Sequence, residues 1–140
     1  MSVTIGGGVN HRFGLYDMIL IKDNHVDYAG GIANAIKSAQ NYLTINQITI
    51  PVEIEVRSLL ELSQVIEIGG VDRILLDNFD FVALREAVEQ INGVYITEAS
   101  GGITEENVLD YAHCGVDYVS MGALTHSVRS LDMSLKAVNP

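Results

Sequence analysis

Short apolar runs alternate along the chain with longer segments in which apolar residues recur at helical spacing. The apolar runs are rich in Ile, Val, Leu and Tyr and have the length of buried strands. We predict five strands, over residues 18–22, 51–56, 73–77, 95–100 and 118–122. We predict four helices between them, over residues 31–43, 58–68, 81–91 and 104–114. The last helix is expected to open with the acidic residues of TEEN and to end before Gly115.

This alternation of strand and helix predicts a parallel sheet. The second to fifth strands start 22, 22 and 23 residues apart, a distance that leaves room for one strand and one helix in each repeat. Parallel strands joined by right-handed crossovers form either an open doubly wound sheet or part of a βα barrel. The two arrangements differ in where the strand ends lie.

Polar residues end every predicted strand and favour the barrel. They are Lys22 and Asp23, Glu55, Asp77 and Asn78, Glu98 with Ser100, Gly101 and Gly102, and Ser120 with Gly122. In a barrel these ends meet at one mouth, whereas an open sheet spreads them along an edge. Five strands are too few to close a barrel of ordinary size. We therefore predict an α/β fold, a partial βα barrel forming a single domain over residues 1–140, completed by other strands or by a partner.

Composition and charge narrow the classes of function. The chain is 48% hydrophobic with a mean hydropathy of +0.24, which is enough apolar material for one core. Its net charge of −10 disfavours binding to nucleic acid or to anionic membrane surfaces. No apolar run is long enough to cross a bilayer. The single Cys114 and an amino terminus, MSVTI, without a basic leader or apolar signal core lead us to expect a cytoplasmic protein.

One stretch concentrates cationic groups in this acidic chain. Residues 6–25 read GGGVNHRFGLYDMILIKDNH and place His11, Arg12 and Lys22 around a short apolar run. Arg12 could hold a carboxylate or phosphate by two parallel bonds, and Lys22 could act as a point charge. A flexible glycine turn with a solvated Arg12 is the alternative. Lys22 is harder to explain in that way, because a lysine that ends an apolar strand needs an anionic partner.

Two glycine-containing segments resemble phosphate-binding turns. Residues 100–103 read SGGI before a predicted helix, and residues 121–127 read MGALTHS after the last strand. Free backbone N–H groups at such places bind anions, although each segment alone also fits an ordinary turn. Glu55 and Asp77 are candidates for holding magnesium or ribose hydroxyls. A salt bridge from these acids to Lys22 or Arg12 is the alternative.

Other polar residues carry weaker indications. His113 and Cys114 lie at a predicted helix end, where capping and packing explain them better than nucleophilic catalysis does. The four histidines lack the spacing of a zinc site. Asn24 and His25 fit a catalytic role and a turn-shaping role equally well.

Six motifs in a fixed order resemble one enzyme family along nearly the whole chain. They are GGGVNHRFGLYDMILIKDNH, VEIEV, ILLDN, EASGGI, GVDY and MGALTHS. In this order they resemble the carboxyl-terminal part of quinolinate phosphoribosyltransferases, the carboxylating nicotinate-nucleotide pyrophosphorylases of NAD biosynthesis. The tetrapeptide KDNH separates that family from its molybdenum-associated relatives.

The resemblance implies a TIM-like phosphoribosyltransferase barrel and a defined reaction. Such an enzyme joins quinolinate to phosphoribosyl pyrophosphate with Mg²⁺ and releases pyrophosphate and carbon dioxide to give nicotinate mononucleotide. Its carboxylate-binding positions match His11, Arg12 and Lys22, and its ribose and metal positions match Glu55 and Asp77. Lys22, Glu55 and Asp77 are the catalytic candidates. The phosphate-loop positions match Ser100, Gly101, Gly102, Gly122 and Ala123.

The family pattern also includes parts that these 140 residues lack. Its members have an amino-terminal domain, the first barrel strands and a TRKT-type basic motif before the glycines, and they work as dimers in which a partner contributes an arginine. We therefore expect a homodimer or a higher homo-oligomer. One alternative is a noncatalytic fragment that associates through exposed sheet edges. Another is a different barrel enzyme for sugar phosphates, which would share the phosphate loops but not the dicarboxylate-binding residues.

Overall fold

The computed structural model describes residues 2–125 and 133, and its centre is a parallel sheet with the strand order β1-β2-β3-β4-β5. The strands are β1 (Ile19–Ile21), β2 (Val52–Val56), β3 (Arg73–Asp77), β4 (Ile96–Ser100) and β5 (Tyr118–Val119). Each strand pairs with the next one along the chain, and the order never reverses. This progression is that of a barrel wall and not of a doubly wound sheet, so the predicted partial βα barrel is confirmed.

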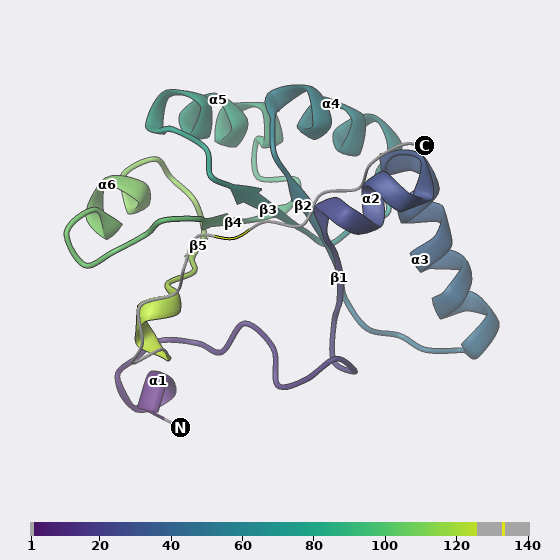
Figure 1. Cartoon of the computed structure of the whole chain (residues 1–140), viewed down its shortest axis with the longest axis horizontal. Coiled ribbons are helices and arrows are strands. Elements are labelled where there is room, and N and C mark those ends of the chain that lie inside the picture. Colours follow the sequence, from purple (N-terminus) through teal and green to yellow (C-terminus); the bar gives the residue numbers. More distant parts are fainter. Residues whose placement is uncertain (1, 126–132, 134–140) are drawn as a thin grey trace.

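The helices lie around the outside of this curved sheet (Figure 1). They are α2 (Asp23–Ala29), α3 (Ile32–Asn46), α4 (Leu59–Ile68), α5 (Phe81–Ile91) and α6 (Val108–Ala112). A short helix α1 (Ser2–Ile5) and the 3-10 helix η1 (Gly122–Leu124) lie together on the other side. The segment from α1 to β1 crosses the inner side of the sheet and so brings residues 6–18 over it.

The core lies between the sheet and the helices. Strand residues that point outward are fully buried and apolar, among them Ile54, Ile74 and Leu76. They pack against apolar stripes of α4 and α5 that include Leu62 and Leu84. Each such side chain contributes about 1.5–3 kcal/mol through its removal from water. This layer fixes which residues of each strand face the other way.

The inner face of the sheet carries the charged strand residues beside apolar ones such as Leu75, because side chains alternate along a strand. It carries Glu53 and Glu55 on β2, opposite the apolar outward positions. Arg73 is the register partner of Glu53, and Asp77 is the register partner of Ser100. The inner face therefore collects acids and a cation from neighbouring strands.

Two aspartates tie neighbouring strands together at their amino-terminal ends. Asp72, directly before β3, accepts a hydrogen bond from the backbone N–H of Val52 at 2.8 Å. Asp117, directly before β5, accepts one from the N–H of Thr97 at 2.8 Å and another from its hydroxyl. Both aspartates follow Gly-Val, so the same short motif makes the same contact twice.

The predicted elements agree with the structure to within three residues at each end, except at the start of the last helix. The helix predicted over 104–114 begins at Val108, because Asn107 folds the preceding residues into a turn. Its side chain accepts the N–H of Thr104 at 2.8 Å and donates to the carbonyl of Gly102 at 3.1 Å. The strand predicted over 118–122 ends at Val119, and Gly122 opens η1 instead.

Helix α2 was not predicted, and its start explains His25. The Nδ1 atom of His25 accepts a hydrogen bond from the backbone N–H of Lys22 at 2.9 Å. Gly30 ends the helix with φ +77°, in the left-handed region where glycine is favoured. His25 thus shapes the turn after β1, which is the second of the two roles expected for it.

Cys114 is buried, and its thiol contacts the carbonyl oxygens of Phe81 and Asp110, as expected for packing. Among the described helices, none has the length and apolar character needed to cross a membrane.

Candidate active site

Two candidate site residues at the carboxyl ends of β3 and β4, Asp77 and Ser100, are hydrogen-bonded to each other. The hydroxyl of Ser100 donates to one carboxylate oxygen of Asp77 at 2.6 Å. The side-chain amide of Asn78 donates to the other oxygen at 2.7 Å. Both oxygens of Asp77 are therefore oriented by neighbours, and its charge is held at the mouth of the partial barrel.

Gly101 is required where it stands, because its backbone has φ +92° and approaches Asn78 closely. A Cβ atom at this position would lie 2.9 Å from the backbone nitrogen of Asn78 and nearer still to its side chain. Gly102 follows with φ +61°. These two glycines make a bare turn beside Asp77, although the turn does not lead straight into a helix as the sequence predicted.

Glu55 lies half-buried among like charges at the same mouth. Burial is the main cause that raises its pKa, and the carboxylates of Asp77 and Asp23 raise it further. Lys22 acts in the opposite direction. Within the described residues, neither Glu55 nor Asp77 forms an ion pair with Lys22 or Arg12. An added cation would relieve the repulsion between these acids, which suits a magnesium site.

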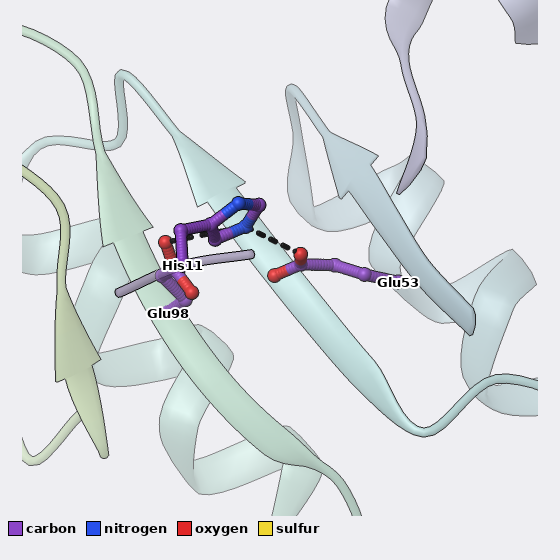
Figure 2. Close-up of side chains that lie close together, drawn as sticks. All are labelled: His11, Glu53 and Glu98. Atoms are coloured by element: carbon purple, nitrogen blue, oxygen red, sulfur yellow. Dashed lines mark hydrogen bonds and ion pairs between the residues drawn. The ribbon is translucent and has the colours of Figure 1, made fainter. Parts of the chain in front are cut away.

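A second cluster lies deeper on the inner face and is centred on His11 (Figure 2). Its Nε2 atom lies 2.7 Å from Oε2 of Glu53 and 3.7 Å from Oε1 of Glu98. Both carboxylates are almost fully buried, with 0% and 2% of their surface exposed. The hydrogen bond to Glu53 is the main cause that raises the pKa of His11 above its ordinary value of 6.5, and the nearby Glu98 adds to it. Burial and Arg12 act against this shift.

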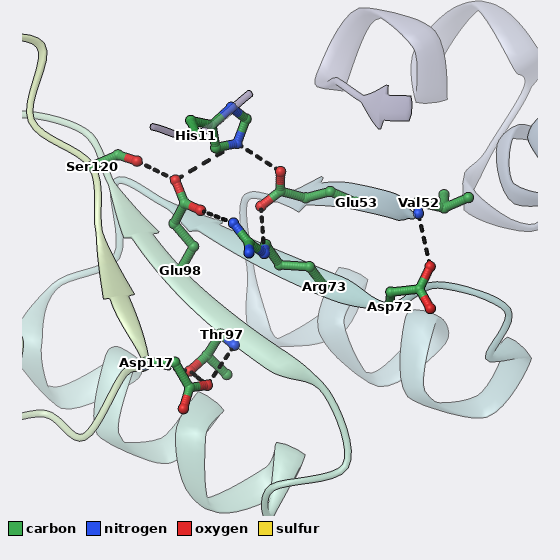
Figure 3. Close-up of polar contacts among 9 residues, drawn as sticks. All are labelled: His11, Val52, Glu53, Asp72, Arg73, Thr97, Glu98, Asp117 and Ser120. Atoms are coloured by element: carbon green, nitrogen blue, oxygen red, sulfur yellow. Dashed lines mark hydrogen bonds and ion pairs between the residues drawn. The ribbon is translucent and has the colours of Figure 1, made fainter. Parts of the chain in front are cut away.

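Arg73 completes this cluster beneath His11 (Figure 3). Its guanidinium donates to Oε2 of Glu98 at 2.9 Å and lies 4.0 Å from Oε1 of Glu53. The same group lies over the ring of Tyr118, 4.7 Å from its centroid. Ser120 donates its hydroxyl to the remaining side of Glu98. The network therefore connects four strands and the amino-terminal segment.

Three potential ligand atoms, one each from His11, Glu53 and Glu98, lie within 4.8 Å of one another, close enough to surround one cation. When His11 is protonated, a form that the hydrogen bond to Glu53 favours, its charge and that of Arg73 balance the two carboxylates. We therefore assign the cluster as an ion-pair network. Glu55 and Asp77 are better suited to magnesium than this cluster is.

His11 also connects this network to the loop after the last strand. Asn10, His11, Ser120 and Gly122 line one shallow pocket. Ala123 is exposed in η1 beside it. His126 and Ser127 of the predicted MGALTHS segment lie outside the described residues.

Arg12 and Lys22 are the two other cations of the candidate site. Arg12 is half-buried next to His11, and Lys22 is exposed directly after β1. In the part of the chain that the structure describes, neither forms a salt bridge or a side-chain hydrogen bond. Two cations without an ion-pair partner among the described residues are suited to an anionic ligand.

Comparison with known proteins identifies the family. The model for the quinolinate phosphoribosyl transferase C-terminal domain matches residues 1–136. The chain belongs to this family. A mitochondrial quinolinate phosphoribosyltransferase (decarboxylating) of Nicotiana tabacum is 48% identical over 96% of this chain and 42% of its own length. A chloroplastic nicotinate-nucleotide pyrophosphorylase (carboxylating) of Arabidopsis thaliana is 48% identical over 96% of the chain and 43% of its own length.

A solved quinolinate phosphoribosyltransferase-type structure agrees with the fold. The nicotinate-nucleotide pyrophosphorylase from Francisella tularensis superimposes with a TM-score of 0.83 and 40% identity, covering 95% of this chain and 46% of its own. The chain thus spans less than half the length of these relatives.

The candidate residues of this quinolinate phosphoribosyltransferase domain fall into two groups. The first group lies together at the strand ends and contains Asp77, Ser100, Gly101 and Gly102. Glu55 lies close enough to it for the charges of Asp77 and Lys22 to affect its pKa. His11 instead joins Glu53, Glu98 and Arg73, which the sequence analysis did not select as site residues. The alternation in VEIEV could have indicated Glu53, because it shares a face with Glu55.

Proposed function

We propose that the chain carries the active-site part of a quinolinate phosphoribosyltransferase, which makes nicotinate mononucleotide from quinolinate and phosphoribosyl pyrophosphate. The observation that carries the proposal is that unpaired cations and crowded acids are both present at the mouth of the partial barrel. Unpaired Arg12 and Lys22 are suited to a dicarboxylate, and the crowded acids Glu55 and Asp77 are suited to a cationic partner. The printed names of the relatives, which include quinolinate and nicotinate nucleotide, support the same reaction.

Quinolinate would be held by His11, Arg12 and Lys22. Its two carboxylates need donors from different directions, and these residues come from the crossing segment and from the end of β1. Arg12 can bind one carboxylate by two parallel bonds, while Lys22 supplies charge. Binding in this way would hold the pyridine nitrogen toward the acids at the mouth.

Phosphoribosyl pyrophosphate would lie along the strand ends with its phosphates on the glycine turns. Ser100, Gly101 and Gly102 offer backbone N–H groups without bulky side chains, and so do Gly122 and Ala123 after β5. Glu55 and Asp77 would hold the ribose hydroxyls and Mg²⁺. Magnesium, when bound, neutralises the leaving pyrophosphate.

The chemistry follows from this placement of charge. The bond between the anomeric carbon and pyrophosphate breaks, and the pyridine nitrogen forms the new bond to that carbon. The carboxylates of Glu55 and Asp77 favour the ribosyl cation that develops between these events, while Lys22 keeps the substrate carboxylate in place. The bond between the ring carbon next to the nitrogen and its carboxylate then breaks and releases carbon dioxide. The electron pair stays on that carbon, where the adjacent positive nitrogen stabilises it, and the carbon takes up a proton from solvent.

We also propose that the chain works as a homodimer or a larger homo-oligomer. Within the described residues, β1 and β5 are the edges of the sheet, and edge strands are sites of association. An apolar groove beside β1 is lined by Ile19, Leu20 and Tyr42. The buried, unpaired Cys114 supports a reducing compartment such as the cytoplasm, although the two plant relatives are named for organelles.

Calorimetric titration of both substrates into the chain tests the proposed function. Quinolinate is expected to bind the unaltered chain, and Arg12→Ala is expected to abolish that binding while phosphoribosyl pyrophosphate with Mg²⁺ still binds. Arg85→Ala, which removes an exposed arginine from α5, is the matched control and should change neither titration. Equal loss of both ligands in Arg12→Ala would favour a different sugar-phosphate enzyme. Absence of binding by a folded chain would favour a noncatalytic module.

A further inference from the structure

Two carboxylates lie buried on the inner face of the sheet, one from β2 and one from β4. Glu53 and Glu98 have 0% and 2% of their surface exposed. Burial of two negative charges is strongly unfavourable unless cations and hydrogen bonds compensate for it. An arrangement that is costly for the fold alone points to a role in the site above it.

The compensating groups come from opposite sides of the carboxylates. Arg73 lies below, 2.9 Å from Glu98 and 4.0 Å from Glu53. His11 lies on the other side of the pair, 2.7 Å from Glu53 and 3.7 Å from Glu98. Two acids balanced by Arg73 and a protonated His11 give a cluster with no net charge. With a neutral His11, the same cluster would hold one uncompensated negative charge.

We propose that Glu53 and Glu98, anchored by Arg73, are positioning residues that hold His11 as a fixed cation for binding a substrate carboxylate. This inference rests on the proposed function, because it concerns how His11 is held to bind a carboxylate of the substrate. Glu53 engages Nε2 of His11, and in the described part of the chain Nδ1 has no hydrogen-bond partner. The ring is therefore oriented by one nitrogen and can donate from the other.

The anchor is rigid because Arg73 and Glu98 are themselves held. The guanidinium of Arg73 lies over the ring of Tyr118 from β5, and Ser120 donates its hydroxyl to Glu98. Figure 3 shows Arg73 and Ser120 approaching the carboxylate of Glu98 from its two sides, below His11. The carboxylate of Glu98 is fixed in this way, whereas that of Glu53 is placed by its burial, by the hydrogen bond to His11 and by the charge of Arg73 4.0 Å from its other oxygen. Together the two acids restrict the position of the imidazole before a ligand binds.

The charged groups that face His11 do not all act in one direction. Glu53 and Glu98 favour its cationic form, whereas the neighbouring Arg12 and partial burial oppose it. A dicarboxylate that binds Arg12 would remove that opposition. Binding and protonation of His11 are therefore expected to support each other.

The test measures the titration of His11 and the binding of quinolinate in the same variants. The pH midpoint of the His11 imidazole is followed by NMR in the unaltered chain and in Glu53→Gln, with His11→Gln used to assign the signal. Quinolinate binding is measured by calorimetry at pH 5.5 and at pH 7.5. Glu105→Gln, an exposed acid of the turn after β4, is the matched control.

Glu53→Gln is expected to lower the midpoint of His11 and to weaken quinolinate binding roughly tenfold or more at pH 7.5, because a shift of one pKa unit corresponds to a tenfold change. At pH 5.5 the higher proton concentration keeps His11 protonated without the help of Glu53, so quinolinate binding should return toward that of the unaltered chain. Glu53→Asp, which keeps the charge, should retain a raised midpoint and protects the test if the glutamine variant fails to fold.

Two results would overturn the proposal. One is an unchanged midpoint of His11 in both Glu53→Gln and Glu98→Gln. The other is an equal loss of quinolinate binding at both pH values, which would indicate a merely structural role. The titration needs no ligand, so if quinolinate fails to bind the unaltered chain, the proposed function is overturned while the titration still decides whether the two acids fix the charge of His11.

Discussion

Glu53 and Arg73 are register partners on adjacent strands, and the Nε atom of Arg73 lies 4.0 Å from Oε1 of Glu53 on the inner face of the sheet. Arg73 also donates to Glu98 at 2.9 Å, so a single guanidinium lies between two buried carboxylates. This cation links the strand pairing of the fold to the charge balance below the candidate site.

Replacement of Arg73 by Met should strongly destabilise the chain. Removing one partner of a buried ion pair leaves an uncompensated charge, with a loss of about 3–5 kcal/mol. Arg57→Met is the matched control, because Arg57 pairs with Asp27 and Glu61 at the surface and exposed pairs contribute about 1 kcal/mol or less. Urea unfolding at pH 7 measures both values. Equal losses in the two variants would contradict a structural role for the buried network.

Gly101→Ala should damage both stability and phosphate binding. The alanine would need φ near +92° and would crowd Asn78, whereas Gly93→Ala meets a positive φ of +70° with no atom within 4 Å. The control therefore isolates the backbone cost, which is about 1–2 kcal/mol. We expect Gly101→Ala to lose more than this in urea unfolding and to weaken phosphoribosyl pyrophosphate in calorimetry. Equal unfolding energies would show that the contact with Asn78 is readily relaxed.

Glu55→Gln should stabilise the free chain while it weakens binding of Mg²⁺ with phosphoribosyl pyrophosphate. The pKa of Glu55 is raised in the folded state by burial and by Asp77 and Asp23. Its protonated form therefore favours folding, and this contribution is present at low pH and lost as the pH rises through the raised pKa. At pH 7 the neutral glutamine avoids that cost. Thermal unfolding should show a higher midpoint for Glu55→Gln, with Glu105→Gln as control, and a lower midpoint would disprove the assignment of repulsion.

The stability of the chain should depend on the charge of His11 above pH 6.5. The folded-state pKa of His11 is raised above 6.5, so its stabilising contribution is complete below that value and is lost as the pH rises through the folded pKa. Urea unfolding over this range should show a decrease that His11→Gln removes. His113→Gln, which changes an exposed histidine at the end of α6, should retain the decrease. A decrease of the same size in His11→Gln would assign it to another group.

The sequence predicts the strand ends of this protein better than the middle of its strands. Asp77 and Ser100 can be selected because they follow apolar runs, and the ends of parallel strands meet at one edge. Glu53 and Arg73 stand inside or at the start of strands, where a charged residue is read as an interruption of the pattern. Their burial depends on the curvature of the sheet and on the segment that carries His11 across it. The local pattern of apolar and polar residues predicts neither of these features.

The errors at two helices have similarly local causes. Helix α2 is a short element whose start depends on the side chain of His25 bonding the N–H of Lys22. The late start of α6 depends on Asn107, which bonds both Thr104 and Gly102. A side chain that competes for backbone groups in this way shifts a boundary without changing the apolar pattern around it.

The two aspartates before β3 and β5 have a consequence for the opposite end of the sheet. Asp72 fastens Val52, and Asp117 fastens Thr97, each the neighbour in sequence of a buried glutamate. A slip of one residue would turn Glu53 or Glu98 outward among the helices and an apolar side chain inward. The alignment of the residues below His11 is thus set by the carboxylates of Asp72 and Asp117, which touch no substrate. Replacement of either aspartate would inactivate the site, although every residue at the mouth would be unchanged.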